Sequence, residues 1–164
     1  MASPAGVSIR VYTETDATTE SAAVTGIDLI SADNATNSTA NRAANPITAG
    51  TQSYEKWLKA YVDTAADNYV NAFKVWGTTA IDSTTTLFVG TVTTGTTPTN
   101  ADSAVATQDW TNYTATNDAL DWHSTNMTAI GSKTVYLVFQ LDTGAAAAAG
   151  NWTQATISYS YDEA

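Results

Sequence analysis

The chain has 164 residues, a formal net charge of −10 and no cysteine, so it forms neither disulfides nor zinc–thiolate sites. Its six lysine and arginine residues, set against 16 acidic residues, are too few to neutralise nucleic-acid phosphates or an anionic membrane surface. Threonine favours the half-buried surface of a strand and supplies 31 of the 164 residues, so the composition favours an all-β fold.

The N-terminal segment, residues 1–5, is expected to be a flexible arm ahead of a single domain at residues 6–164. It lacks the basic and apolar stretches of a signal peptide. No run in the chain approaches the roughly 18 apolar residues of a membrane span. We therefore expect a protein made in the cytoplasm, with neither a membrane nor a nucleic acid as its partner.

Alternation of apolar and polar residues predicts a first strand at residues 6–12. Residues 22–30 are a second strand candidate, in which Gly26 suggests a bulge. Residues 31–50 are polar, show no periodicity and contain Pro46, so they predict a long loop that is functional, mobile or ordered only against a partner chain. The alternating apolar residues of the first strand are Val7, Ile9 and Val11.

The segment at residues 53–76 fits two alternatives. Every fourth position carries an apolar residue or glycine, and most of these residues are aromatic, a spacing typical of an amphipathic helix. The same segment also divides into strands at residues 54–62 and 69–76, joined by a connection in which Asp and Asn favour a turn. The hairpin is the favoured alternative, because the remainder of the chain is rich in strand-forming residues. The four-residue repeat comprises Trp57, Tyr61, Ala65, Tyr69, Phe73 and Gly77.

Further strands are predicted in the C-terminal half. Residues 87–93 form a short strand, and residues 94–107 form a loop rich in Gly, Pro and Thr. A strand is expected within residues 108–116. Residues 134–141 are almost continuously apolar, which indicates burial on both faces. A last strand at residues 152–161 alternates apolar residues with small polar ones.

Together these segments predict about seven or eight short antiparallel strands separated by turns. The expected fold is an all-β sandwich of about this many strands, and the sequence leaves jelly-roll and immunoglobulin-like topologies equally open.

Catalytic patterns are weak. His123 is the only histidine, so a Ser-His-Asp relay would depend on it, with Asp118 and Asp121 nearby in sequence. The G-x-S-x-G motif of many hydrolases is missing from the sequence. A histidine in a loop or edge position explains His123 better, and acid pairs arise by chance in a chain with 16 acids. We therefore expect no enzymatic activity and no catalytic residues.

Cofactor and metal patterns are equally sparse. The sequence contains neither a phosphate-binding glycine loop nor a dinucleotide fingerprint. Asp63, Asp67 and Asn68 supply hard oxygen ligands in one loop, which leaves calcium as an alternative, but turn formation explains them better. We expect no cofactor and no metal. The five Asn-X-Ser/Thr sequons, at Asn34, Asn37, Asn112, Asn126 and Asn151, reflect the composition of the chain.

Interface residues are the remaining candidates. Trp110 and Trp122, with Tyr113, lie in polar stretches, where aromatic side chains could anchor a contact. The arm and the long loop could order against neighbouring subunits. The predicted interface therefore comprises Ser3, Pro4, Asn37, Asn41, Trp110, Tyr113 and Trp122.

Three stretches resemble a pattern in virion-associated proteins of tailed phages. They are Tyr54–Lys59, Tyr69–Gly77 and Thr156–Glu163. That group includes small β-sandwich decoration, or cement, proteins of the capsid. The resemblance implies a homotrimer clamped over junctions between major capsid subunits, and it implies no catalytic residues.

The expected function is therefore that of a capsid decoration protein, located on the virion surface after synthesis in the host cytoplasm, with the major capsid protein as partner. The alternative is a tail, fibre or head-surface adhesin domain, in which Trp110, Tyr113 and Trp122 bind a host glycan. A cellular carbohydrate-binding or adhesion module is a further alternative.

Overall fold

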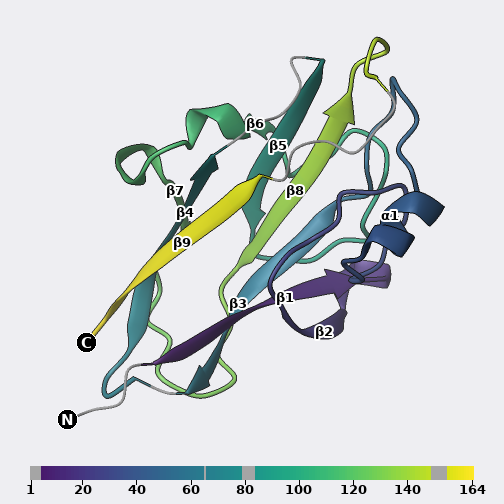
Figure 1. Cartoon of the computed structure of the whole chain (residues 1–164). Helices are drawn as coiled ribbons and strands as arrows, with labels where there is room; N and C mark the ends of the chain where they lie inside the picture. Colours follow the sequence, from purple (N-terminus) through teal and green to yellow (C-terminus); the bar gives the residue numbers. More distant parts are fainter. Residues whose placement is uncertain (1–4, 65, 79–83, 149–154) are drawn as a thin grey trace.

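The computed structural model describes residues 5–64, 66–78, 84–148 and 155–164. Two antiparallel sheets stack face to face, one with six strands in the order β2-β1-β3-β8-β5-β6 and one with three in the order β7-β4-β9 (Figure 1). This arrangement confirms the predicted all-β sandwich. The larger sheet comprises β1 (Gly6–Thr13), β2 (Thr19–Val24), β3 (Lys56–Thr64), β5 (Thr85–Val92), β6 (Gln108–Asp109) and β8 (Tyr136–Thr143). The smaller comprises β4 (Val70–Thr78), β7 (Leu120–His123) and β9 (Thr156–Glu163).

The segment at residues 53–76 forms two strands, as predicted, but they do not form a hairpin. β3 pairs with β1 and β8 in the larger sheet, whereas β4 pairs with β7 and β9 in the smaller one. Each strand has an apolar face, carried by Leu58 in β3 and by Phe73 in β4, and both belong to one core. Placing the strands in opposite layers buries these faces against each other, which side-by-side pairing in one sheet would not do.

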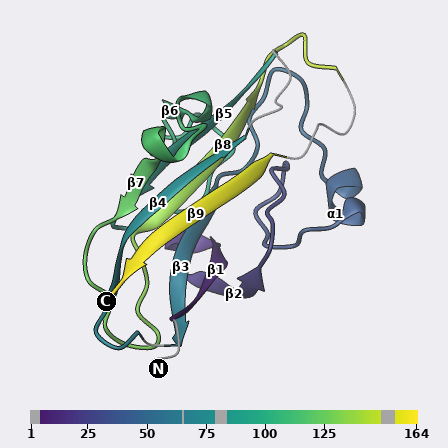
Figure 2. The same ribbon diagram turned by 60° about the vertical axis from the view of Figure 1, so that its left-hand side comes forward.

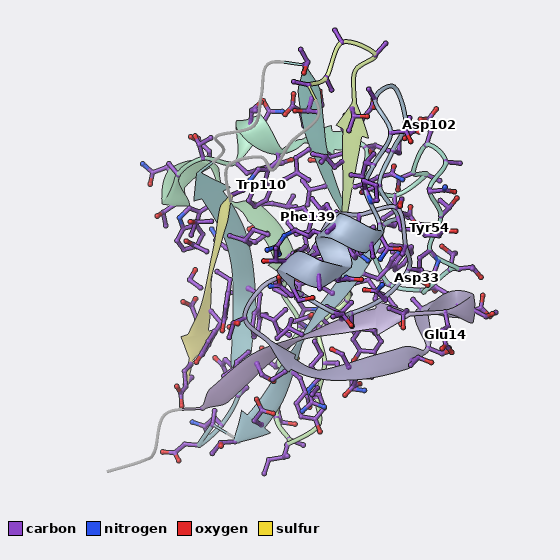
Figure 3. All side chains as sticks on the ribbon, turned by 45° about the vertical axis from the view of Figure 1, so that its right-hand side comes forward. Glu14, Asp33, Tyr54, Asp102, Trp110 and Phe139 are labelled. Atoms are coloured by element: carbon purple, nitrogen blue, oxygen red, sulfur yellow. The ribbon has the colours of Figure 1, made fainter. Side chains whose placement is uncertain are left out.

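The interior core lies between the two sheets. Phe73 of β4 contacts Trp122 of β7 edge to face, at 6.0 Å between ring centroids. Phe139 of β8 contacts Trp110 in the same manner, at 5.1 Å. Figure 3 shows Trp110 and Phe139 between the two layers. Edge-to-face aromatic pairs of this kind add to the stability that burial itself provides.

Strand β8 is buried on both faces, which confirms the prediction from its apolar run. Its second face belongs to a separate hydrophobic cluster on the outer side of the larger sheet. The segment at residues 94–107, a loop as predicted, packs on this outer side: a Cβ added to Gly90 of β5 would lie 1.9 Å from the carbonyl oxygen of Val105. The buried members of this outer cluster are Tyr12, Ala17, Trp57, Ala106, Tyr136 and Val138.

Several boundaries differ from the predictions. β2 covers only part of residues 22–30, because the chain leaves the sheet after Val24. Within residues 108–116 the strand is two residues long, since a 3₁₀ turn begins at Trp110, where Asp109 accepts a hydrogen bond from the Thr111 amide. Strand β7 was not predicted. Residues 152–154 of the last predicted strand lie outside the described residues.

The long polar segment at residues 31–50 contains one short helix, α1 (Thr39–Ala44), which was not predicted. The Ser38 hydroxyl caps it by accepting a hydrogen bond of 3.1 Å from the Asn41 amide. Figure 2 shows α1 to one side of the sandwich, away from β7. Within the described part of the chain, no helix has the length and apolar character needed to cross a membrane.

Candidate functional site

The two tryptophans predicted as contact residues are both buried, so that prediction is wrong. Trp110 is 0% exposed, because the 3₁₀ turn directs its ring into the interior against Phe139. Trp122 is 3% exposed, because it lies on the inward face of β7 against Phe73. Its indole nitrogen donates a hydrogen bond of 3.0 Å to the carbonyl oxygen of Val135. Neither indole is available to a partner or to a sugar ring.

The remaining predicted contact residues do not form one surface. Tyr113 is half-buried beside Trp110 and donates a hydrogen bond to Gln108. Asn41 lies in α1 and Asn37 just before it, and α1 is on the other side of the molecule from the β6 region (Figures 1 and 2). Ser3 and Pro4 lie outside the described residues.

Asn41 serves the fold of its own loop. Its side-chain nitrogen donates to Asn34 at 3.0 Å and to the carbonyl oxygen of Thr36 at 2.6 Å, and its side-chain oxygen accepts from Asn45 at 3.0 Å. Asn37 is exposed and accepts a hydrogen bond of 3.2 Å from Arg42. Internal bonds therefore hold the segment at residues 31–50, whether or not it also meets a partner chain.

A different group of side chains forms a charged, aromatic surface. It lies on the outer side of the larger sheet and combines three tyrosines with three of the six basic residues of the chain. Alternation along each strand places Arg10 and Tyr12 of β1 on one face, and Lys59 and Tyr61 of β3 on that same face. We name this surface the tyrosine–cation array: Arg10, Tyr12, Lys59, Tyr61, Lys133 and Tyr136.

Pairing between strands brings these side chains together. Arg10 lies opposite Lys59 in the β1–β3 register, and Tyr61 forms an isolated bridge with Lys133. Like charges directly opposite one another are unfavourable, so Arg10 and Lys59 need compensating partners. The structure provides aromatic rings for both and carboxylates for one.

Cations and rings alternate across the array. Lys59 Nζ lies 3.8 Å from the Tyr136 ring centroid and 5.7 Å from that of Tyr12. Lys133 Nζ lies 5.6 Å from the ring centroids of both Tyr12 and Tyr61. The guanidinium carbon of Arg10 lies 3.4 Å from the Tyr61 centroid. All these separations are within the range of cation–π attraction.

Glu20 of β2 holds one side of the array. It accepts hydrogen bonds of 2.5 Å from Arg10 and from the Tyr12 hydroxyl, and a third from Lys133. Burial raises the pKa of Glu20, but these three hydrogen bonds outweigh burial and lower the pKa to about 2. Asp63 accepts a second hydrogen bond from Arg10, at 3.1 Å. Three cations against two carboxylates leave the array with one excess positive charge in a chain of net charge −10.

Lys59 differs from every other basic residue. The structure describes all six lysines and arginines, and within the described ranges Lys59 alone has no hydrogen-bond acceptor and no carboxylate within ion-pair distance. Burial, with a smaller contribution from the neighbouring charge of Lys133, lowers the pKa of Lys59 against an opposing effect of Glu20. Among the described residues, the array therefore holds a half-buried cation that no carboxylate contacts directly, although Glu20 attracts it at longer range.

The chemistry of this surface is that of recognition. Tyrosine and arginine are enriched at protein–protein interfaces, because they offer large contact areas with polar groups at the tip. Two of the rings, Tyr12 and Tyr136, are only 4% and 8% exposed, so they do not offer an open face for stacking on a sugar. The sequence carried a signal for this surface in its two cation-x-tyrosine repeats, Arg10-Val11-Tyr12 and Lys59-Ala60-Tyr61, but not the strand register that unites them.

The other candidate centres have structural explanations. His123 accepts a hydrogen bond of 3.4 Å from the Val135 amide, and burial, with a smaller effect of Lys59, lowers its pKa. Asp121 lies 3.8 Å from Lys74, and Asp63 is bonded to Arg10. In the part of the chain that the structure describes, no three Asp, Glu or His residues gather as a metal site would require.

A shallow depression of about 200 Å³ lies at the β5–β8 region of the larger sheet. Its polar lining includes Asp102 and Asp142, and the Gln52 amide donates to both, at 2.9 Å and 3.4 Å. These carboxylates are therefore already partnered within the chain.

Comparison of the chain with protein-family models, with curated proteins and with solved structures finds no match in any of the three. The class that the geometry defines is an all-β sandwich with a charged aromatic surface on the outer side of its larger sheet.

Proposed function

We propose that this chain is a decoration protein that binds the outer surface of a tailed-phage capsid through the tyrosine–cation array and stabilises the shell. The observation that carries the proposal is the concentration of three of the six basic side chains on one tyrosine-rich sheet face, with Lys59 left unpaired. The resemblance of three sequence stretches to virion-associated proteins supports the choice of partner, the major capsid protein.

The geometry of the array suits repeated docking. Its side chains project from β1, β3 and β8, in which β3 pairs with both neighbours, and from Lys133, which bridges to Tyr61 of β3. Backbone pairing therefore positions most of the surface before a partner binds. In a symmetric shell the same contact is repeated many times, and a homotrimer gains further affinity through linked sites. A modest contact per copy is therefore sufficient for stable decoration.

Co-sedimentation with capsids tests the proposal. Decoration-free capsids of a phage that encodes the chain are mixed with purified protein, pelleted and assayed for bound copies and for heat resistance. We expect binding and stabilisation by the natural chain and by Lys74→Met, a control on the smaller sheet, but weakened binding by Lys59→Met with Tyr61→Ala. Failure of the natural chain to bind, or equal binding by both variants, would count against the proposal.

Size-exclusion chromatography with light scattering tests the proposed assembly. A homotrimer has three times the 17.2 kDa mass of the chain. The adhesin alternative depends on Trp110 and Trp122 as sugar-binding residues, and both are buried. Binding of the natural chain to a host glycan on an array would favour that alternative over decoration.

A further inference from the structure

Acidic side chains greatly outnumber basic ones in this chain. The chain has 16 acidic residues for six basic ones, so acceptors for a cation are abundant. Arg42 bonds to Asp28 at 2.7 Å, Lys56 bonds to two backbone carbonyls, and Lys74 lies near Asp121. Against this background, Lys59 lacks an acceptor within the described residues, although it is held in the middle of a surface.

The position of Lys59 is fixed by aromatic rings. Its ammonium lies over the Tyr136 ring, 3.8 Å from the centroid, and 5.7 Å from the centroid of the Tyr12 ring. Cation–π attraction is directed at the charge as a whole and leaves ammonium N–H groups free to donate. The side chain is half-buried, so an incoming group can reach it.

We infer that Lys59 is the anchoring cation for a carboxylate of a partner protein, so that the tyrosine–cation array recognises an acidic surface segment. This inference rests on the proposed binding role of the array and specifies the chemistry of the partner. A carboxylate supplies the acceptor that Lys59 lacks, and it also relieves repulsion among Lys59, Lys133 and Arg10.

Two other ligand classes fit less well. A sugar needs an open ring face, and Tyr12 and Tyr136 are nearly inaccessible, with Lys59 over the Tyr136 ring. A nucleic-acid backbone needs several unpaired cations in a row, whereas Glu20 already binds two of the three cations here. A single protein carboxylate matches the single uncompensated charge of the array.

A soluble probe tests this inference independently of any capsid. Hexa-L-glutamate is titrated into the isotope-labelled full-length chain at low salt, with hexa-L-glutamine as the neutral control, and the Lys59 Cε–Hε resonance is followed by NMR. We expect saturable binding of hexaglutamate with a shift of that resonance. Lys59→Met is expected to weaken binding about fivefold, the magnitude of one exposed ion pair, while Lys74→Met has no effect.

Several outcomes overturn the inference: no binding of hexaglutamate at millimolar concentration, equal binding of hexaglutamine, or equal effects of Lys59→Met and Lys74→Met. Far-UV circular dichroism of both variants confirms that they fold. The capsid assay separates the two claims, because capsid binding that is insensitive to Lys59→Met overturns only the carboxylate anchor. Hexaglutamate binding without capsid binding overturns only the decoration function.

Discussion

The carboxylate of Glu55 accepts a hydrogen bond of 2.9 Å from the indole nitrogen of Trp57, two residues further along the chain. Residues two apart in an extended chain lie on the same face, so both side chains point to the outer side of the larger sheet. The same carboxylate accepts hydrogen bonds from the Ser103 hydroxyl and, at 3.3 Å, from the Thr99 amide. Glu55 therefore fastens the loop at residues 94–107 over the outer cluster.

Removal of Glu55 should destabilise the protein strongly. Glu55 is 3% exposed, and Glu55→Ala leaves the Trp57 indole and the Ser103 hydroxyl without their buried acceptor. We expect a loss of about 2–4 kcal/mol in the free energy of unfolding, measured by urea titration. Asp118→Ala, at an exposed carboxylate, is the control and should cost far less; equal losses would contradict this role of Glu55.

Gly90 is required because the loop approaches the sheet too closely for a side chain. A Cβ at this position would lie 1.9 Å from the carbonyl oxygen of Val105, well inside contact distance. Gly90→Ala should therefore displace the loop and cost about 1–3 kcal/mol in the free energy of unfolding. Thr91→Ala, at the exposed neighbouring position, should change the stability little. An unchanged Gly90→Ala protein in thermal and urea unfolding would show that the loop does not pack as described.

The pattern of apolar and polar residues was sufficient to predict those strands whose burial follows from their own sequence. The apolar run of β8 indicated burial on both faces, and β1 alternated clearly. The assignment of β3 and β4 to different sheets was not predictable, because the same apolar faces permit a hairpin until the core between the layers is known. Trp110 was wrongly predicted to be a contact residue because its neighbours in the sequence are polar. Those neighbours form a tight 3₁₀ turn, which places one buried ring among exposed residues.

The tyrosine–cation array was not predicted from the sequence, for a related reason. Its members come from β1, β3, β8 and the segment before β8, and only strand register brings them together. Alternation could show that Arg10 and Tyr12 share a face. It could not show that Lys59 would be left without a carboxylate, since that depends on which strands become neighbours.

The buried lysine of β3 should make the free energy of unfolding increase with pH in the alkaline range. Lys56 is 1% exposed and donates to the carbonyl oxygens of Ala32 and Asn34, at 2.9 Å and 2.8 Å. Burial lowers its pKa to about 8, against an opposing effect of Asp33 and Asp28. Between this value and the ordinary lysine pKa of 10.5, the unfolded chain binds more protons than the folded one. The stability contributed by this site therefore rises with pH across that window.

Urea titrations at pH 7.5 and 9.5 measure this rise. We expect a gain on the order of 1–2 kcal/mol for the natural chain, and a smaller gain for Lys56→Met, which has no proton to lose. Lys74→Met should retain the full gain. The net rise in stability with pH ends near pH 10. Burial raises the pKa of Tyr12, so above the ordinary tyrosine pKa of 10.0 the unfolded chain loses a proton that the folded chain retains, and the folded state loses stability. An identical slope in Lys56→Met and the natural chain would contradict the role assigned to Lys56.

Replacement of Glu20 should lower stability and raise affinity for an acidic partner at the same time. Glu20→Gln weakens the bonds to Arg10, Lys133 and the Tyr12 hydroxyl, so we expect a loss of about 1–2 kcal/mol in the free energy of unfolding at pH 7. The natural chain should lose this contribution as the pH falls from 4.5 towards the lowered pKa of about 2, and the variant should lack that acid-dependent loss.

Because two cations lose their internal carboxylate in Glu20→Gln, hexaglutamate should bind the variant more tightly in the NMR titration. Asp118→Asn, which changes the net charge equally at an exposed position outside the array, is the matched control and should leave hexaglutamate binding nearly unchanged. Weaker hexaglutamate binding by Glu20→Gln would refute an array that recognises carboxylates.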